Sequence, residues 1–138
     1  FALEQGFSVI LCIGETLAER KAGKLNSILW LQPERGLAGL GPNADYSRLA
    51  VAYEPVWAIG TGQTASDEDI RMVHPLIREP LSSLLGSNGI GIQILYGGSV
   101  KPDNAKAILS LDNVDGLLVG GASLQAQSFA DIVRADLA

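Results

Sequence analysis

The sequence predicts an α/β fold in which four consecutive β-α units build one parallel sheet. Four short runs rich in Val, Ile and Leu, at residues 8–13, 49–53, 92–96 and 116–119, alternate with longer stretches of helical patterning. Apolar strands that alternate with helices are typical of a parallel sheet buried on both faces. A length of 138 residues suits one domain with a sizeable core, so we expect residues 1–138 to form a single domain.

The composition excludes several classes of protein. Apolar residues make up 47% of the chain and charged residues 18%, which is typical of a soluble globular domain and not of a disordered tail. The net charge of −5, with no cluster of Lys and Arg beyond a pair, argues against nucleic-acid binding. The longest apolar runs are too short to cross a membrane. No grouping of Asp, Glu and His has the spacing of metal ligands, so we expect no metal site.

Cys12 is the only cysteine of the sequence, so the chain cannot form an internal disulfide. This favours a reducing compartment and a cytoplasmic location. We expect Cys12 to be a small buried hydrophobic residue of the first strand rather than a nucleophile.

Sequence signals mark the expected start of each helix. Thr16 with Glu19, and Ser66 with Asp69, have the capping-box spacing, at which each side chain satisfies a backbone N–H group of the other residue. Pro102 suits the first position of a third helix. The last helix is expected just after Gly121, with an apolar face formed by Phe129, Ile132, Val133 and Leu137.

Prolines interrupt the two longest predicted helices. The segment 17–40 contains Pro33, and the segment 67–85 contains Pro75 and Pro80. A proline inside a helix costs about 3 kcal/mol, because it removes a hydrogen bond and clashes with the preceding turn. We therefore expect these helices either to break at the prolines or to be partly unravelled.

Glycine-rich turns follow the third and fourth predicted strands, at the end where parallel β/α folds collect their functional residues. These turns are Gly97-Gly98-Ser99 and Gly120-Gly121. Glycines there let backbone N–H groups approach an anion, and a following helix start adds the positive end of its dipole. One diglycine alone is more often a tight turn, but two at adjacent strand ends beside a carboxylate favour an anion site.

Glu54 stands at the end of the second strand, directly before Pro55 and a segment that runs to Gly62. Pro55 biases Glu54 toward an extended backbone, and the apolar residues Trp57 and Ile59 can cover a site. Proton abstraction beside a carbonyl requires such a base together with a cover that excludes water. A salt bridge at a strand end is the plainer role for Glu54, and this context disfavours it.

Other polar residues carry weaker signals. Glu15 is either an acid in the first turn of a helix, favoured by the dipole, or a contact of the segment after Glu54. His74 is the only histidine, and we expect it to have a surface or packing role because it lies within an outer helix. Lys101 and Lys106 are expected to be solvated.

Four motifs resemble the triosephosphate isomerase family in its order and approximate spacing. They are Cys12-Ile13-Gly14-Glu15-Thr16, the run from Ala52 to Gly62, Tyr96-Gly97-Gly98-Ser99-Val100, and the run from Asp115 to Leu124. The resemblance covers essentially the whole chain, but only about the second half of the family's length. It implies an α/β fold of the (β/α)8 TIM barrel type, in which this chain supplies the last four β/α units as a parallel half-barrel.

The resemblance also implies individual roles. Glu54 would be the catalytic base, and residues 55–65 would form a lid that closes over the substrate. The expected lid residues include Pro55, Val56, Trp57, Ala58, Ile59, Thr61 and Gly62. The backbone N–H groups expected to bind the substrate phosphate are those of Gly60, Ser99, Gly120 and Gly121. Tyr96 with Ala65, and Ser99 with Gly62, would latch the closed lid. Leu118 with Ile59 would cover the base.

The implied function is the cofactor-free interconversion of dihydroxyacetone phosphate and glyceraldehyde 3-phosphate through an enediolate, in glycolysis and gluconeogenesis. The substrate is a small triose phosphate, and the family is homodimeric. The family's electrophilic histidine and active-site lysine lie in its first half. We therefore expect this chain alone to have little or no isomerase activity. Open sheet edges should make the chain marginal alone, or lead it to self-associate or to require the missing N-terminal half.

Two other classes of function stay open. One is a different phosphate-binding β/α barrel enzyme, which would share the two glycine turns but not Glu54 with its following segment. The other is a non-catalytic half-barrel scaffold that keeps a phosphate-binding half-site, and the interrupted helices favour it.

Overall fold

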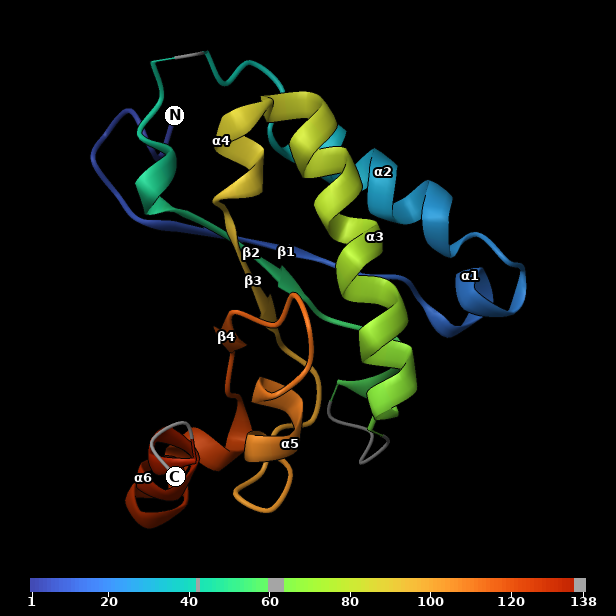
Figure 1. The fold of residues 1–138 in the computed structure, drawn as a ribbon, viewed down its shortest axis with the longest axis vertical. Helices are drawn as coiled ribbons and strands as arrows, with labels where there is room; N and C mark the ends of the chain where they lie inside the picture. Colours follow the sequence, from blue (N-terminus) through green and yellow to red (C-terminus); the bar gives the residue numbers. More distant parts are fainter. Residues whose placement is uncertain (42, 60–63, 136–138) are drawn as a thin grey trace.

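A computed structural model describes residues 1–41, 43–59 and 64–135 (Figure 1). Its strands are β1 (Val9–Ile13), β2 (Leu49–Tyr53), β3 (Gln93–Tyr96) and β4 (Gly116–Leu117). Its α-helices are α1 (Leu17–Lys21), α2 (Leu25–Gly36), α3 (Asp67–Leu85), α4 (Ser87–Ile90), α5 (Ala105–Leu109) and α6 (Ala126–Arg134). Short 3₁₀ helices are η1 (Tyr46–Arg48), η2 (Val56–Ala58) and η3 (Gly121–Leu124).

The strands form one sheet in the order β1-β2-β3-β4, and every neighbouring pair is parallel. This confirms the predicted succession of β-α units. The fourth strand is shorter than the predicted 116–119, since it ends at Leu117 and η3 follows from Gly121. Since all strands run the same way, their carboxyl ends lie at one edge of the sheet.

Only one face of the sheet is covered by helices in the described ranges. Val9, Leu11 and Ile13 of β1 pack into or against the core, whereas Ile10 is 47% exposed and Cys12 is exposed as well. The prediction of a sheet buried on both faces, and of Cys12 as a buried residue, is therefore wrong for these residues. The alternation of side chains along a strand places Ile10 and Cys12 on the uncovered face.

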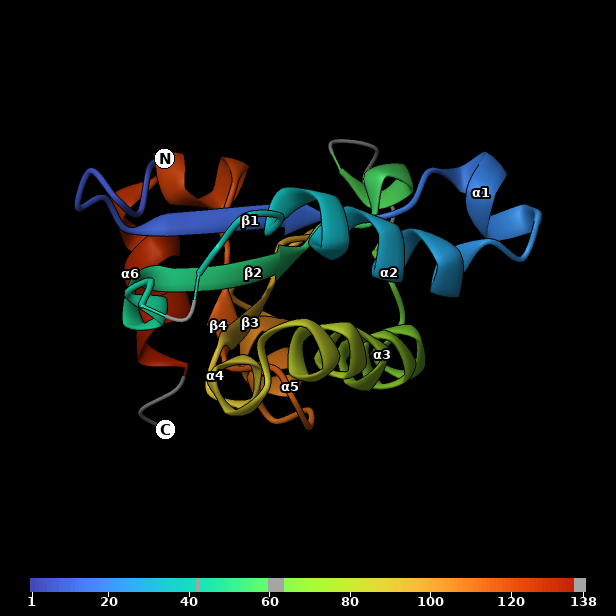
Figure 2. The ribbon, with the colours of Figure 1, turned by 90° about the horizontal axis from the view of Figure 1, so that it is seen from above.

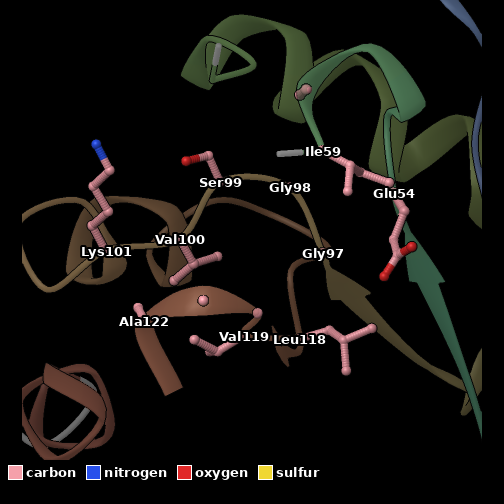
Figure 3. Close-up of a pocket in the computed structure, with 13 residues that line it drawn as sticks. Glu54, Ile59, Gly97, Gly98, Ser99, Val100, Lys101, Leu118, Val119 and Ala122 are labelled. Atoms are coloured by element: carbon pink, nitrogen blue, oxygen red, sulfur yellow. The ribbon is translucent and has the colours of Figure 1, made fainter. Parts of the chain in front are cut away.

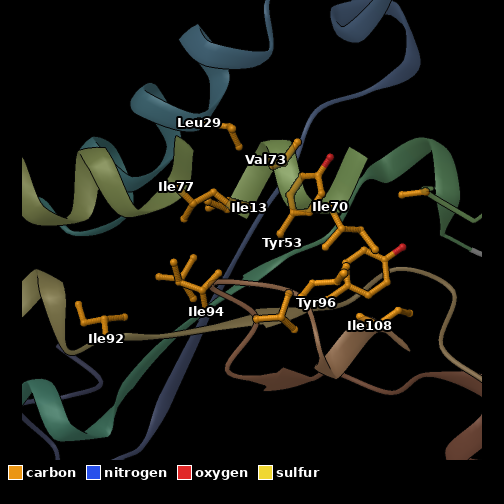
Figure 4. Close-up of a cluster of buried hydrophobic side chains, with 14 of the residues drawn as sticks. Ile13, Leu29, Tyr53, Ile70, Val73, Ile77, Ile92, Ile94, Tyr96 and Ile108 are labelled. Atoms are coloured by element: carbon orange, nitrogen blue, oxygen red, sulfur yellow. The ribbon is translucent and has the colours of Figure 1, made fainter. Parts of the chain in front are cut away.

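The core lies between the sheet and the helices α2 and α3, which lie side by side in both overall views (Figures 1 and 2). Strands and helices contribute interdigitating apolar side chains (Figure 4). Fully buried members with no exposed surface include Leu29, Val51, Tyr53, Ile70, Ile77, Ile94 and Tyr96.

The two long helices do not break at their prolines. α3 runs without interruption through Pro75 and Pro80, and α2 continues past Pro33 to Gly36. Burial explains why α3 stays continuous where the sequence predicts a break. Its buried face includes Ile70, Val73, Ile77 and Leu81. At about 1.5–3 kcal/mol for each buried side chain, this face outweighs a cost of about 3 kcal/mol for each proline. The 17–40 segment is interrupted instead at Gly23, which has a φ of +68°.

Both predicted capping boxes are confirmed. The Glu19 N–H donates to Thr16 Oγ1 at 3.3 Å, and the Thr16 N–H donates to Glu19 Oε2 at 2.8 Å. Ser66 and Asp69 form the same reciprocal pair at the start of α3. These boxes fix the first turns of α1 and α3.

The later helix starts differ from the sequence pattern. Pro102 lies in a turn, and α5 begins at Ala105, because Asn104 accepts from the Lys101 N–H at 2.8 Å and donates to Ser99 O at 3.0 Å. The last helix, α6, begins at Ala126 and not just after Gly121 as expected, because the short 3₁₀ helix η3 occupies Gly121–Leu124. On the predicted apolar face of α6 only Ile132 is buried, while Phe129 is 43% and Val133 54% exposed. Leu137 lies outside the described residues. None of the described helices combines the length and hydropathy needed to span a bilayer.

Candidate active site

A pocket of about 640 Å³ lies at the carboxyl ends of β2, β3 and β4 (Figure 3). Backbone hydrogen bonds extend the parallel ladder up to its mouth. The Gly97 N–H donates to Tyr53 O at 2.8 Å, and the Leu118 N–H donates to Tyr96 O at 2.9 Å. The segments that follow the three strands are thereby held together at one place. The lining residues are Glu54, Ala58, Ile59, Gly97, Gly98, Ser99, Val100, Lys101, Leu118, Val119, Gly120, Gly121 and Ala122.

Glu54 extends from the end of β2 past the Gly97 segment on the side where Leu118 lies (Figure 3). Its N–H donates to Ile13 O at 2.7 Å, which fixes its backbone. The glycines that directly follow both neighbouring strands, Gly14 after β1 and Gly97 after β3, make room for it. A Cβ on Gly97 would lie 2.6 Å from Glu54 Cγ, and a Cβ on Gly14 would lie 1.8 Å from the Glu54 carbonyl oxygen. Sequence reasoning missed this steric role of Gly14 and Gly97.

The glycine turns lie in the same pocket as Glu54. Ser99 follows β3, and Gly120 and Gly121 follow β4. Among the described residues, apart from the adjacent ones in the chain, no heavy atom lies within 4 Å of the position of a Cβ on Gly120 or Gly121, which leaves room for a ligand at their backbone. Gly98 has a different use, since a Cβ there would lie 2.1 Å from Tyr96 Oη. The predicted phosphate role of these N–H groups stays a prediction.

The segment after Glu54 continues as η2, and Ala58 and Ile59 line one side of the pocket. Within this segment Ala58 is buried, while Val56 and Ile59 are exposed. Ile59 lines the pocket together with Glu54 and Leu118, which is the grouping expected of an apolar cover. Of the other residues predicted to form the lid or to bind phosphate through it, Gly60, Thr61 and Gly62 lie outside the described residues.

Tyr96 and Ala65, the predicted latch, are both buried. Burial raises the pKa of Tyr96, and the nearby backbone of Ala65 opposes part of this rise. The phenolic oxygen nevertheless has no hydrogen bond of standard geometry among the described residues. The latch between Tyr96 and Ala65 stays a prediction.

Glu15 contacts the predicted lid, which decides between the two roles that its sequence position left open. Its carboxylate is fully buried. It accepts hydrogen bonds from Trp57 Nε1 at 2.9 Å, from Arg20 Nη1 at 3.0 Å and from Tyr53 Oη at 3.1 Å. Burial and then the negative charge of Glu15 raise the pKa of Tyr53, so its phenol stays protonated and donates.

Arg20 and Lys101 are site-adjacent residues that sequence reasoning did not identify. The Arg20 guanidinium lies 4.9 Å from the centre of the Trp57 ring, while it also donates to Glu15. Its place one residue after the capping Glu19 could have indicated a side chain aimed at the strand end. Lys101 is exposed, as expected of a solvated residue, and it also lines the pocket (Figure 3).

His74 and Cys12 are not among the residues that line the pocket, although the Cys12 thiol lies within hydrogen-bonding reach of Glu54. His74 is fully buried, and its Nδ1 donates to Asn113 O at 2.8 Å, so its role is packing and not a surface one. Cys12 is exposed, yet partial desolvation and then the charge of Glu54 raise the pKa of its thiol, which disfavours a nucleophile. Within the described ranges, no group of three or more His, Cys, Asp or Glu side chains could hold a metal ion.

Comparisons with known proteins agree with this arrangement. Residues 1–136 match the family described as triosephosphate isomerase. The triosephosphate isomerase of Nitratidesulfovibrio vulgaris (strain DSM 19637 / Miyazaki F) is 55% identical over 135 residues, which cover 98% of this chain and 54% of the relative. That of Lawsonia intracellularis is 57% identical over 134 residues, which cover 97% of this chain and 53% of the relative.

A solved structure gives the same answer for the fold. The crystal structure of triosephosphate isomerase from Bartonella henselae matches 99% of this chain and 54% of its own, with a TM-score of 0.86 and 39% identity. The chain therefore spans about half the length of the curated relatives that it matches. Its sequence, its parallel half-barrel sheet and its pocket lead to one conclusion: the chain belongs to the triosephosphate isomerase family and carries part of the TIM-barrel fold.

Proposed function

We propose that this chain supplies the catalytic base, lid residues and phosphate-binding turns of a triosephosphate isomerase. The enzyme would interconvert dihydroxyacetone phosphate and glyceraldehyde 3-phosphate. The observation that supports this most strongly is the pocket that joins Glu54 to the turns at Ser99 and Gly120–Gly121. A carboxylate at one end and open backbone N–H groups at the other match a substrate with a carbon acid and a phosphate.

Each part of the pocket would have a distinct task. The N–H groups of Ser99, Gly120 and Gly121 would hold the phosphate, assisted by that of Gly60, which lies outside the described residues. Glu54 would take a proton from the carbon beside the carbonyl, leaving an enediolate, and return it to the neighbouring carbon. The transfer moves hydrogen within one molecule, so it needs no redox cofactor. An apolar cover that includes Ile59 would keep water away from the intermediate.

The chain alone should turn substrate over slowly or not at all. An enediolate needs groups that stabilise the charge on its oxygen, and in the family these are a histidine and a lysine of the first half. These 138 residues span about half of the relatives' length. We further propose that the complete protein is a cytoplasmic homodimer, as the resemblance and the single cysteine favour.

A non-catalytic scaffold that binds phosphate is the second candidate. The uncovered sheet face, where Ile10 and Cys12 are exposed, favours it, because a barrel enzyme needs that interior filled.

A ligand titration followed by an assay separates the two candidates. Glycerol 3-phosphate, which has the phosphate and the three carbons but no carbonyl, is added to ¹⁵N-labelled chain, with glycerol as the matched control. We expect saturable shifts of the Ser99, Gly120 and Gly121 amides with the phosphate compound only. A coupled isomerase assay on the same sample should show little turnover. Absence of any saturable shift would overturn the phosphate site, and turnover near that of a full-length relative would overturn the proposed dependence on the first half.

A further inference from the structure

Arg20 contacts groups from both ends of the segment that joins β2 to α3. Its side chain is 24% exposed and lies in the short helix α1, whose first turn is fixed by the Thr16–Glu19 capping box. Figure 2 shows α1 next to the segment that carries η2. No other described arginine or lysine bridges two acidic side chains in this way.

At the first end, Arg20 holds the η2 side of the segment through Glu15 and Trp57. Arg20 Nη1 donates to Glu15 Oε1 at 3.0 Å, and the same oxygen accepts from Trp57 Nε1 at 2.9 Å. The guanidinium also lies over the indole ring at 4.9 Å from its centre, a favourable cation–π distance. The Val56 N–H donates to the Glu15 carbonyl at 3.1 Å, so backbone and side chain are tied to one residue.

At the second end, Arg20 Nη2 pairs with Asp69 in the first turn of α3. Asp69 divides its two carboxylate oxygens between two tasks. Oδ2 accepts from the Ser66 N–H at 3.1 Å and from the Ser66 hydroxyl at 2.7 Å, which caps the helix, and Oδ1 accepts from Arg20. Ser66, which directly follows segment 55–65, is thereby linked through Asp69 to the same guanidinium that lies over Trp57.

We infer that Arg20 is a positioning residue that couples the two ends of segment 55–65 through Glu15 and Asp69. The planar guanidinium presents several N–H groups in fixed directions, so one group can hold two carboxylates and a ring at set angles. Glu15 is fully buried and needs its charge compensated, which keeps Arg20 in place. Loss of the Asp69–Arg20 ion pair should therefore also weaken the contacts that Arg20 and Glu15 make with Trp57. The consequence for ligand binding rests on the proposed function, whereas the coupling itself does not.

The coupling is tested with Trp57 as the reporter. Trp57 and Trp30 are the two tryptophans of the sequence, so a Trp30→Phe background isolates the signal. The critical variant is Asp69→Asn, which keeps an oxygen for the Ser66 cap but removes the charge that pairs with Arg20. The matched control is Asp67→Asn, which makes the same change of charge in the same turn at a residue that has no ion pair among the described residues.

Acrylamide quenching of Trp57 gives the readout, and circular dichroism checks that each variant keeps its helix content. We expect the quenching constant to rise in Asp69→Asn and in Arg20→Lys, because residues that share one hydrogen-bond and ion-pair network are energetically coupled. Asp67→Asn should leave it unchanged. An unchanged constant in Asp69→Asn, or an equal rise in Asp67→Asn, would overturn the coupling.

A ligand arm tests the consequence for the pocket. If glycerol 3-phosphate binds the parent chain, Asp69→Asn should weaken it and Asp67→Asn should not, because Ala58 and Ile59 of the held segment line the pocket. Equal affinity of the two variants for glycerol 3-phosphate would show that loss of the Asp69–Arg20 pair does not affect the pocket. Failure of the parent chain to bind would refute the proposed function and leave the quenching result to decide the coupling.

Discussion

Glu54 owes its position to the absence of side chains on the strands beside it. A Cβ on Gly14 would lie 1.8 Å from the carbonyl oxygen and 2.6 Å from the carbonyl carbon of Glu54, and these are backbone atoms that cannot turn away. The placement of the proposed base is therefore part of the fold and not only of its own rotamer.

Replacing Gly14 by alanine should consequently destabilise the whole chain. We expect Gly14→Ala to lower the free energy of unfolding by about 3 kcal/mol or more, through overpacking against backbone. Gly91→Ala is the matched control, because its Cβ would meet only Asn88 O at 3.8 Å. Urea unfolding monitored by circular dichroism measures the free energy of unfolding of both variants. Equal stability of the two variants would show that the strands around Glu54 are not packed as described.

His74 makes the stability of the chain depend on pH. Burial lowers its pKa from 6.5, and this outweighs the opposing effects of Asn113 O and Asp115, while Arg78 lowers it further. The unfolded chain then binds a proton at a pH where the folded chain does not. The stabilisation is complete above about pH 6.5 and is lost as the pH falls toward the lower folded-state pKa.

Urea unfolding at about pH 7.5 and pH 5.5, on either side of the ordinary histidine pKa, tests this dependence. We expect the midpoint to be lower at the acidic pH, and the difference to shrink in His74→Gln. The same acid-induced loss in the variant would assign it to other groups.

That Glu54 and the glycine turns meet at one pocket was predictable from sequence, but many of their surroundings were not. Glu54 and the glycine turns stand out because their spacing along the chain marks successive strand ends. The burial of Glu15 and its bond to Trp57 depend on contacts between residues 42 positions apart, which local patterns do not contain. Cys12 was misjudged because an apolar strand does not reveal whether its second face is covered.

At the level of elements, the helices show how packing overrides local preference. Capping boxes predicted the starts of α1 and α3 because they act within one turn. The prediction that α3 breaks at its prolines was wrong because it counted only the local free-energy cost of a proline in a helix. The stabilisation by the buried face of α3 comes from packing against residues of the sheet and of α2, which are distant in sequence.

Removing an exposed proline should accordingly stabilise α3. Pro75 is exposed within the helix, so Pro75→Ala restores a backbone N–H and loses little packing. We expect a gain of about 1–2 kcal/mol, after part of the roughly 3 kcal/mol helix penalty is offset by the greater freedom of the unfolded chain. Pro80→Ala should gain less because Pro80 is buried. A lower urea midpoint for Pro75→Ala than for the parent would show that Pro75 does not destabilise α3.

At the level of the whole molecule, the sheet is unfinished within the described residues. β1 and β4 each pair on one side only, and Ile10 is 47% exposed on the uncovered face. Unpaired strand edges beside apolar surface promote association.

The isolated chain should therefore self-associate as its concentration rises. Sedimentation velocity over a range of concentrations should show a growing population above the monomer mass, and Ile10→Lys should reduce it. The surface variant Arg134→Gln serves as a control, because Arg134 is 69% exposed on α6. A well-dispersed monomer at every concentration would contradict this account of the open sheet.

The most direct test of the central claim is hydrogen exchange at the substrate carbon. The chain is completed with the first half of the Lawsonia intracellularis relative, and deuterium entry into dihydroxyacetone phosphate is followed by proton NMR. We predict exchange in the completed protein and a rate lower by roughly 10²–10⁴-fold in its Glu54→Ala variant, the range expected for loss of a general base. Exchange that continues at the same rate without the Glu54 carboxylate would contradict the assignment of this residue as the base.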